Sequence, residues 1–153
     1  MSRIALVTGG MGGLGEAIAI KLAAMGYRVV VTHSLNNTKA PEWLTKMAEM
    51  GYHFRAYPVD VADFDSCVEC VAKVKAEVGP GDVLVNNAGI TRDKFFHKME
   101  KAQWDAVLRV NLDSMFNVTR DIAPKMAERG WGRIINISSV NGVKGQAGQT
   151  NYA

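Results

Sequence analysis

Short apolar segments alternate along this chain with segments of helical periodicity, and this alternation restricts the possible folds more than any other feature. The predicted strands span residues 4–8, 28–32, 54–59, 82–86 and 133–138. Because they are apolar on both faces, we expect a parallel sheet that helices cover on both sides. Right-handed crossovers then predict an α/β fold, a doubly wound sheet of the Rossmann type with strand order 3-2-1-4-5.

The segments between the predicted strands have the spacing and the boundary residues of helices. The predicted helices span residues 13–25, 41–50, 64–78, 100–103 and about 104–128. Gly26, Gly51 and Gly130 each follow such a segment, as glycines that end helices do, and Asp63 can cap the third one. The length fits one domain, which we expect to span residues 1–153.

The charge and hydropathy of the chain exclude several classes of function. The net charge is only +3, and no run of lysines and arginines could follow a nucleic-acid backbone. No apolar stretch reaches the ~20 residues that a transmembrane helix needs, and residues 4–7 leave no room for a signal peptide. His33, His53 and His97 lack the spacing of metal ligands. We therefore expect a cytoplasmic protein without a metal site, a nucleic-acid partner or a membrane segment.

The two cysteines, Cys67 and Cys70, form a C-x-x-C arrangement that allows two interpretations. Redox pairs of this spacing lie at a helix N-terminus, where the helix dipole lowers the thiol pKa. Here Cys67 lies in the middle of an apolar helical face that Phe64, Val71 and Val74 continue. This position favours packing in the core over redox chemistry, because a free cysteine behaves there as a small apolar residue.

The first predicted strand runs directly into a glycine-rich segment, Thr8-Gly-Gly-Met-Gly-Gly-Leu-Gly15, that opens the first helix. Glycines in this place let the backbone turn sharply and approach a pyrophosphate, which then lies at the positive end of the helix. The candidate dinucleotide-binding residues are Gly9, Gly12, Gly13, Leu14 and Gly15. A plain tight turn is the alternative. A phosphate loop of the NTPase type is excluded because no Gly-Lys-Ser/Thr follows.

The end of the second predicted strand bears on the choice between NAD(H) and NADP(H). A free ribose 2′-hydroxyl is normally held by an acidic residue there, but the strand ends in Thr32-His-Ser34 and no carboxylate occurs before Glu42. Hydroxyl groups such as that of Ser34, together with Lys39, would accept a 2′-phosphate. This favours NADP(H), although Lys39 could also be an ordinary solvated loop lysine.

Asp60 and Val61 follow the third predicted strand and are candidates for binding the adenine ring. The carboxylate of Asp60 could accept from the adenine amino group, while the backbone amide of Val61 pairs with the ring. An aspartate in such a turn is equally common as a helix cap, so both interpretations stay open.

Further motifs complete a pattern that resembles one enzyme family. Asn86-Asn-Ala-Gly89 follows the fourth strand, Asn111 lies in the long helix, and Ser139 precedes Tyr152 by 13 residues. With the glycine segment and the Asp-Val pair, this arrangement resembles the short-chain dehydrogenases/reductases over all of residues 1–153. The resemblance implies a nicotinamide cofactor and transfer of a hydride.

The resemblance also implies a role for individual residues. Those expected near the cofactor are Asn87, Ala88, Gly89 and Ile90. Asn111 would be the structural catalytic asparagine that holds a water of the proton relay, although a polar residue that merely distorts a helix is the alternative. Ser139 would polarise the substrate carbonyl, with its neighbour Ser138 as a less favoured candidate because adjacent strand residues face opposite sides. Tyr152 would be the general acid.

Within the family, the sequence is similar to the acetoacetyl-CoA reductases, notably in Lys144-Gly-Gln-Ala-Gly-Gln-Thr-Asn-Tyr152. This similarity implies NADPH-dependent reduction of acetoacetyl-CoA to (R)-3-hydroxybutanoyl-CoA, by a protein that would be a homotetramer. The residues implied for the acyl-thioester pocket are Asp93, Lys98, Gln146 and Gln149. Lys98 could equally be a surface lysine, and Ala147 stands where a bulky aromatic residue is expected. The 3-oxoacyl-carrier-protein reductases remain the alternative.

The proposed acid, Tyr152, raises a question about the last part of the chain. A free phenol has a pKa of about 10, so proton donation near neutral pH needs assistance. The family supplies it from a lysine four residues later, and the sequence ends at Ala153. We therefore expect a sheet truncated after its fifth strand and a cofactor domain incomplete at its C-terminus. The chain by itself could then be a non-catalytic nucleotide-binding fragment.

Overall fold

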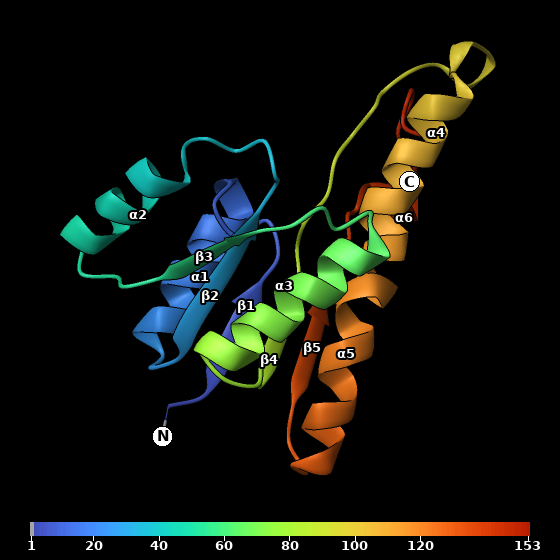
Figure 1. Cartoon of the computed structure of the whole chain (residues 1–153). Helices are drawn as coiled ribbons and strands as arrows, with labels where there is room; N and C mark the ends of the chain where they lie inside the picture. The colour runs from blue at the N-terminus through green and yellow to red at the C-terminus, as the bar shows by residue number, and fades with distance from the viewer. Residues whose placement is uncertain (1) are drawn as a thin grey trace.

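The protein forms a five-stranded parallel sheet with helices on both faces, as a computed structural model shows for residues 2–153 (Figure 1). The strands are β1 (Ile4–Val7), β2 (Arg28–His33), β3 (Arg55–Pro58), β4 (Val83–Asn86) and β5 (Arg133–Asn136). Their order in the sheet is β3-β2-β1-β4-β5, and every neighbouring pair is parallel. The doubly wound α/β fold and the strand order predicted from the sequence are therefore confirmed.

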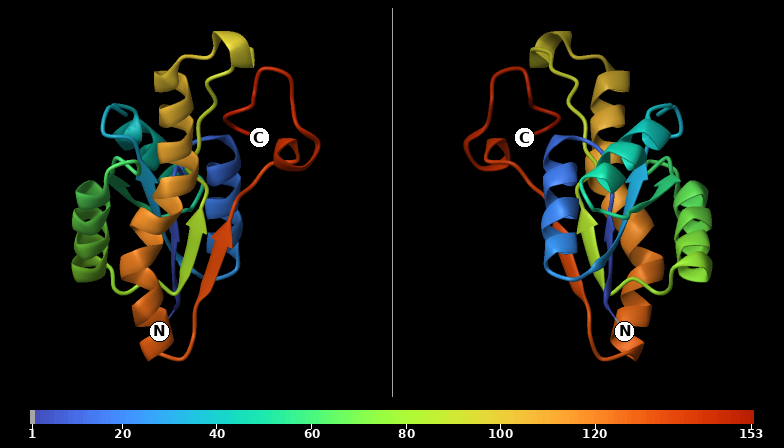
Figure 2. Two further views of the ribbon diagram at one scale, coloured as in Figure 1. Left: turned by 90° about the vertical axis from the view of Figure 1, so that its right-hand side faces the viewer. Right: turned by 90° about the vertical axis from the view of Figure 1, so that its left-hand side faces the viewer.

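Helices connect consecutive strands and divide between the two faces of the sheet (Figure 2). The α-helices are α1 (Gly13–Ala24), α2 (Ala40–Glu49), α3 (Phe64–Glu77), α4 (Lys101–Leu108), α5 (Ser114–Glu128) and α6 (Asn141–Lys144). Buried residues of α3 and α5 pack on one face of the sheet, and buried residues of α1 and α2 pack on the other. Among the described residues, no helix is both long enough and apolar enough to cross a bilayer.

Consecutive residues of β1 show how the sheet supplies two cores. Ile4 and Leu6 belong to the cluster formed with α3 and α5, whereas Ala5 and Val7 belong to the cluster formed with α1 and α2. Side chains along a strand point alternately to opposite faces, so a strand buried on both sides must be apolar throughout. All four residues of β1 are accordingly buried, and this explains the uninterrupted apolar segments of the sequence.

The two cysteines are part of the core, as the sequence indicated. Cys67 and Cys70 are buried on α3, and both are free thiols. Burial raises the pKa of the Cys67 thiol to about 12 and that of Cys70 to about 11. Thiolate is the reactive form of cysteine, so thiols of such high pKa are poorly suited to redox chemistry at neutral pH.

The long helix differs from its prediction in two respects. A helical column runs without interruption from Lys101 to Glu128, and its middle, Arg109–Asp113, is a π-helix. The predicted short helix at residues 100–103 is wrong: Glu100 caps α4, its backbone N–H donating to Oε1 of Gln103 at 3.0 Å. The short helix is instead a 3₁₀ turn at Phe96–Lys98. Helical spacing does not distinguish a cap residue from a first helical turn, which accounts for the difference.

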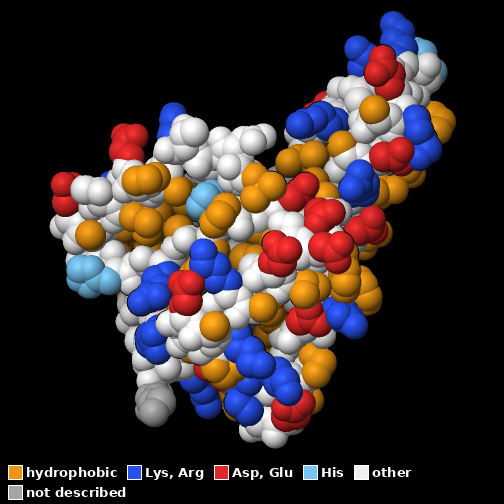
Figure 3. All heavy atoms as spheres, in the orientation of Figure 1, with side chains coloured by type: hydrophobic (Ala, Val, Ile, Leu, Met, Phe, Trp, Pro, Cys, Tyr) orange, Lys and Arg blue, Asp and Glu red, His pale blue; other side chains and the backbone are white. Residues whose placement is uncertain are grey.

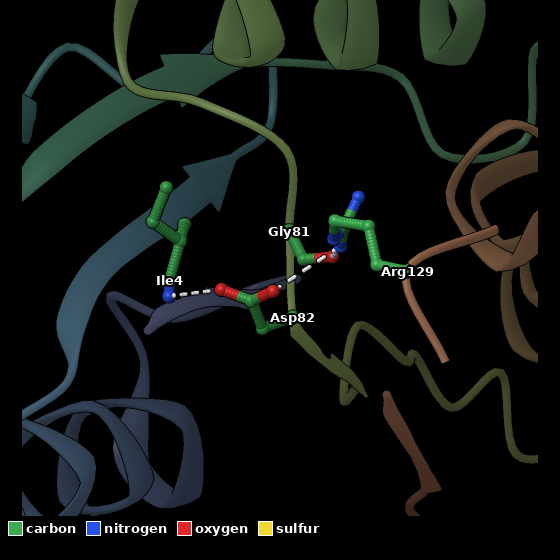
Figure 4. A network of polar contacts seen from close by, with 4 residues as sticks. All are labelled: Ile4, Gly81, Asp82 and Arg129. Carbon is green, nitrogen blue, oxygen red and sulfur yellow. Dashed lines mark hydrogen bonds and ion pairs between the residues drawn. The ribbon is translucent and has the colours of Figure 1, made fainter. Parts of the chain in front are cut away.

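A polar clamp joins the amino ends of β1 and β4 to the end of α5 (Figure 4). Asp82 accepts from the backbone N–H of Ile4 at 2.9 Å and from the guanidinium of Arg129 at 3.2 Å. The same guanidinium nitrogen donates to the carbonyl of Gly81 at 2.8 Å. The clamp holds the end of the sheet opposite to the one at which ligands bind in such folds.

Strand β5 and the first turn of α5 each expose apolar side chains. Strand β5 is an edge of the sheet, with Ile134 and Ile135 more than 40% exposed. On α5, Phe116 is 64% exposed and stacks on Phe64 of α3 at 6.2 Å between ring centroids. Exposed apolar patches of this kind mark surfaces that another part of a protein or another subunit covers.

Candidate active site

Two cavities open at the carboxyl end of the sheet, where the surface is hollowed between the part that carries α2 and the arm that carries α4 (Figure 3). The first has a volume of about 430 Å³ and lies beside the ends of β1, β2 and β3. The second has a volume of about 470 Å³ and lies beside the ends of β4 and β5. Ala88 and Gly89 line both cavities. A ligand that extends from one cavity to the other would therefore cross this dipeptide.

The glycine segment is packed too closely for side chains at two positions. A Cβ on Gly15 would lie 2.3 Å from the carbonyl oxygen of Gly9, and a Cβ on Gly10 would lie 2.6 Å from the side chain of Val31. Gly9 also has a φ of 62°, which favours glycine. A Cβ on Gly12, by contrast, would meet nothing within 4 Å. The loop is thus pressed against β2 and α1 while the N-terminus of α1 stays open.

The open N-terminus of α1 has the properties of a phosphate site. Gly12 is the N-cap residue and has no side chain to satisfy the first backbone N–H groups of the helix. These groups and the helix dipole attract anions. The exposed Leu14 lies in the same first turn. The predicted residues Gly12, Gly13, Leu14 and Gly15 therefore surround this helix end, while Gly9 lines the first cavity.

Thr8 joins the glycine segment to the end of β4. Its buried hydroxyl accepts from the backbone N–H groups of Asn87 and Ala88, both at 3.0 Å, and donates to the carbonyl of Val85 at 3.4 Å. The Asn87 side chain donates in return to the carbonyls of Thr8 and Gly9, at 3.0 and 3.2 Å. These bonds fix the Ala88–Gly89 boundary between the cavities relative to the glycine segment.

The first cavity brings together several of the residues predicted to bind the cofactor. Ser34, Asp60, Val61 and Ile90 all line it. One carboxylate oxygen of Asp60 accepts from the backbone N–H of Ala62 at 3.0 Å, as in a turn. The cap of α3 is a different residue, Asp63, whose carboxylate accepts from Ser66 N at 2.7 Å.

Lys39 is not brought to this cavity. It is the exposed N-cap residue of α2, and its backbone N–H donates to the side chain of Asn37 at 2.8 Å. The neighbouring wall at the end of β2 consists of His33, Ser34, Leu35 and Asn36. Among the residues that line this cavity, Asp60 is the one carboxylate, and it follows β3 and not β2.

The second cavity brings together the three predicted catalytic residues. Asn111, Ser139 and Tyr152 line it, although they come from the π-helix, the segment after β5 and the last turn of the chain. Ser138 lines it as well, so the choice between the two serines stays a prediction. The Ser139 hydroxyl accepts from the backbone N–H of Asn141 at 3.2 Å, and its own proton is left for another acceptor.

Asn111 has a local structural partner, the peptide of Ile90. Its Oδ1 accepts from Ile90 N at 2.8 Å, and its Nδ2 donates to Ile90 O at 2.9 Å. Both ends of the side-chain amide are therefore bonded to the segment that follows β4. The side chain holds that segment against the π-helix, directly beside the shared dipeptide.

The predicted thioester-binding residues divide into two groups. Asp93 and Gln149 meet, Nε2 of Gln149 donating to a carboxylate oxygen of Asp93 at 2.9 Å. None of the four residues lines either cavity. Asp93, Lys98 and Gln146 are exposed, Gln149 is half-buried, and Lys98 lies in the 3₁₀ turn. The geometry thus joins Asp93 and Gln149 by a hydrogen bond, and it places none of the four side chains in the lining of the cavity that contains Ser139 and Tyr152.

Three functional positions were missed by the sequence reasoning. Thr8 and Thr32 hold the glycine loop, the Thr32 hydroxyl accepting from Gly9 N at 3.3 Å. The third is Asn151, a buried residue that lines the second cavity. Thr8 could have been found as the threonine that opens the glycine motif. Asn151 is marked only by its place directly before Tyr152.

No cluster of metal-binding side chains occurs within residues 2–153, since no three His, Cys, Asp or Glu residues are gathered in a suitable arrangement. The polar groups that line the two cavities include hydroxyls, amides and backbone N–H groups, together with His33 and the carboxylate of Asp60. Groups of this kind suit an organic ligand with phosphates and ribose hydroxyls.

Comparison with known proteins finds a matching family model and several similar sequences. A family model described as short chain dehydrogenase matches residues 3–153. The chain is 62% identical over 151 residues to nodulation protein G of Azospirillum brasilense, covering 99% of this chain and 61% of that protein. It is 56% identical over 151 residues to an acetoacetyl-CoA reductase of Cupriavidus necator, with the same coverage. Another acetoacetyl-CoA reductase, of Allochromatium vinosum, is 53% identical over 154 residues, which are 63% of its length. The chain thus spans about three fifths of these relatives.

Proposed function

The chain belongs to the short-chain dehydrogenase family, and on this premise we propose that its protein reduces acetoacetyl-CoA to (R)-3-hydroxybutanoyl-CoA with NADPH. The observation that carries the proposal is the meeting of Ser139 and Tyr152 in one cavity that borders the candidate cofactor cavity at Ala88 and Gly89. Two relatives named acetoacetyl-CoA reductase, at 56% and 53% identity, support the choice of substrate.

The residues present fit a dinucleotide. The open N-terminus of α1 suits a pyrophosphate, because the uncapped N–H groups there are free to donate and a Cβ at Gly12 would find open space. Ser34 and Asp60 would lie along the adenosine part, and the shared dipeptide would lie beneath the nicotinamide. When bound, the cofactor supplies the hydride for the substrate carbonyl. We assign the whole of residues 1–153 to this cofactor-binding domain.

The end of β2 favours NADPH over NADH. A carboxylate there would repel a 2′-phosphate, and the wall at this point has Ser34 and Asn36 as its polar neutral side chains. Lys39 is exposed at the start of α2, so it could reach a phosphate only from the solvent side. Comparing kcat/KM for the two cofactors under the same conditions tests this choice.

The chemical step needs a group that polarises the ketone and a group that donates a proton. The Ser139 hydroxyl accepts from Asn141 N, which orients it to donate its own hydrogen to the substrate oxygen. Tyr152, in the same cavity, donates a proton to that oxygen. We assign Asn111 to positioning, because both of its amide groups bond to the Ile90 peptide.

The full-length protein tests the proposal directly. Purified protein should oxidise NADPH when acetoacetyl-CoA is added, and chiral analysis should find the (R) product. Tyr152→Phe should abolish turnover, and Ser139→Ala should reduce kcat by about a hundredfold or more. The matched control is Ser138→Ala, a neighbouring hydroxyl at the same cavity, which should retain most activity. A rate no higher than background with acetoacetyl-CoA would refute the proposal, and a preference for 3-oxoacyl-carrier-protein thioesters would identify the alternative substrate.

A further inference from the structure

Asn151 is a buried polar residue directly before Tyr152, and its side chain bonds to two distant backbone groups. It is 5% exposed and lines the second cavity. Its Nδ2 donates to the carbonyl of Arg92 and to the carbonyl of Gln103, both at 3.1 Å. Its Oδ1 is buried and has no hydrogen-bond donor among residues 2–153. The orientation of the amide is therefore set by its NH₂ group, which bonds to both carbonyls.

The two carbonyls lie on either side of the segment that carries the predicted thioester residues Asp93 and Lys98. Arg92 precedes this segment, and Gln103 lies in the first turn of α4. One side chain thus holds both ends of the segment and is linked covalently to the candidate acid. Because Tyr152 is the next residue, these bonds restrict the movement of its backbone.

Further hydrogen bonds connect the same two parts of the chain nearer the surface. Lys94 N donates to Gly148 O at 2.8 Å. Gln149 donates to Asp93 and accepts from the side chain of Asn141, both at 2.9 Å. The Asp93–Gln149 bond is exposed, so water competes with it. The bonds of Asn151 come from a buried amide and are therefore harder to replace by solvent.

We propose that Asn151 is a positioning residue that holds Tyr152 in a fixed position relative to the 92–103 segment. The acid then keeps a fixed position relative to the bound thioester. The proposal rests on the ketoreductase function argued above. Removing the NH₂ group leaves two carbonyls without their donor and frees both ends of the segment. A misplacement of about 1 Å at a reacting group can lower the rate by about a hundredfold.

The experiment compares three variants of the full-length protein. Asn151→Asp keeps the size of the side chain but places a carboxylate oxygen against the two carbonyls. Asn151→Ala removes the side chain, and Thr150→Ala changes an exposed neighbour as the control. We expect both Asn151 variants to lower kcat with acetoacetyl-CoA by about ten- to a hundredfold, with unchanged NADPH affinity. The control should match the wild type.

Two readouts distinguish positioning from a merely structural role. The Asn151→Asp deficit should shrink as the pH is lowered, because a protonated carboxyl can donate one hydrogen bond again, while the Asn151→Ala deficit should not. Hydrogen exchange of Asn151→Ala should rise together in residues 92–103 and 146–153 and stay unchanged in β1. Unchanged kcat would overturn the proposal, and so would a parallel loss of NADPH affinity and melting temperature. If the wild type reduces no thioester, the proposed function fails, and the exchange result still decides whether Asn151 joins the two segments.

Discussion

Replacing Thr8 by valine should destabilise the protein although the two side chains have the same shape. The Thr8 hydroxyl accepts from two backbone N–H groups, those of Asn87 and Ala88, and valine leaves both without an acceptor. An unsatisfied buried donor costs about 1–3 kcal/mol, and because residues 87 and 88 are half-buried we take the lower part of that range. At about 1–1.5 kcal/mol for each of the two N–H groups, Thr8→Val should lower the free energy of unfolding by about 2–3 kcal/mol in total.

Urea unfolding of the full-length protein measures this loss. With a slope of about 1–3 kcal/mol per molar urea, the midpoint should fall by about 1 M or more. Thr8→Ser is the matched control, since it keeps the hydroxyl and loses one methyl group, at about 1 kcal/mol. NADPH affinity should fall in Thr8→Val but not in Thr8→Ser, because the bonds fix Ala88 beside the glycine segment. Equal stability of the two variants would show that the hydroxyl does not hold these groups.

Two further predictions concern the glycine segment and the cysteines. Gly15→Ala should abolish NADPH binding in calorimetry, because its Cβ would lie 2.3 Å from Gly9 O. The control is Gly12→Ala, whose Cβ would meet nothing within 4 Å and which should keep the loop intact. NADPH binding by Gly15→Ala would contradict this packing. Cys67 and Cys70, with thiol pKa values raised to about 12 and about 11, carry almost no thiolate at pH 8, so a disulfide reagent should modify them only after unfolding.

The sequence was sufficient to predict the sheet, because the central strands β1, β2 and β4 are buried along most or all of their length and therefore have to be apolar on both faces. Val29, Val30 and Val31 of β2 belong alternately to the two cores. Three consecutive apolar residues therefore already indicate a strand that helices cover on both faces. The turn after β1 was predictable for a similar reason, since the close approach of Gly15 to the loop is possible only for glycine. In both cases a local pattern reflects a local steric requirement.

The details of the site depended on contacts between distant residues. Asn111 bonds to Ile90, 21 positions away, and Asn151 bonds to Arg92, 59 positions away. No periodicity in the sequence specifies such pairs. For Asn111 the sequence therefore allows a water-binding role or a distortion of the helix without indicating its bonds to Ile90, and for Asn151 it indicates no partner at all. Lys39 and Lys98 illustrate the opposite difficulty, because a long charged side chain gives no indication of whether it meets a ligand or solvent.

The boundary between the two cavities also affects the order in which two ligands can bind. Ala88 and Gly89 form one wall of each, so the two ligands cannot occupy wholly independent compartments. Under the proposed function, a dinucleotide lying across this dipeptide would form part of the surface that the thioester meets. The substrates should then bind in a compulsory sequence, with the dinucleotide first on and last off. Product-inhibition patterns in steady-state kinetics would test this order of binding and release.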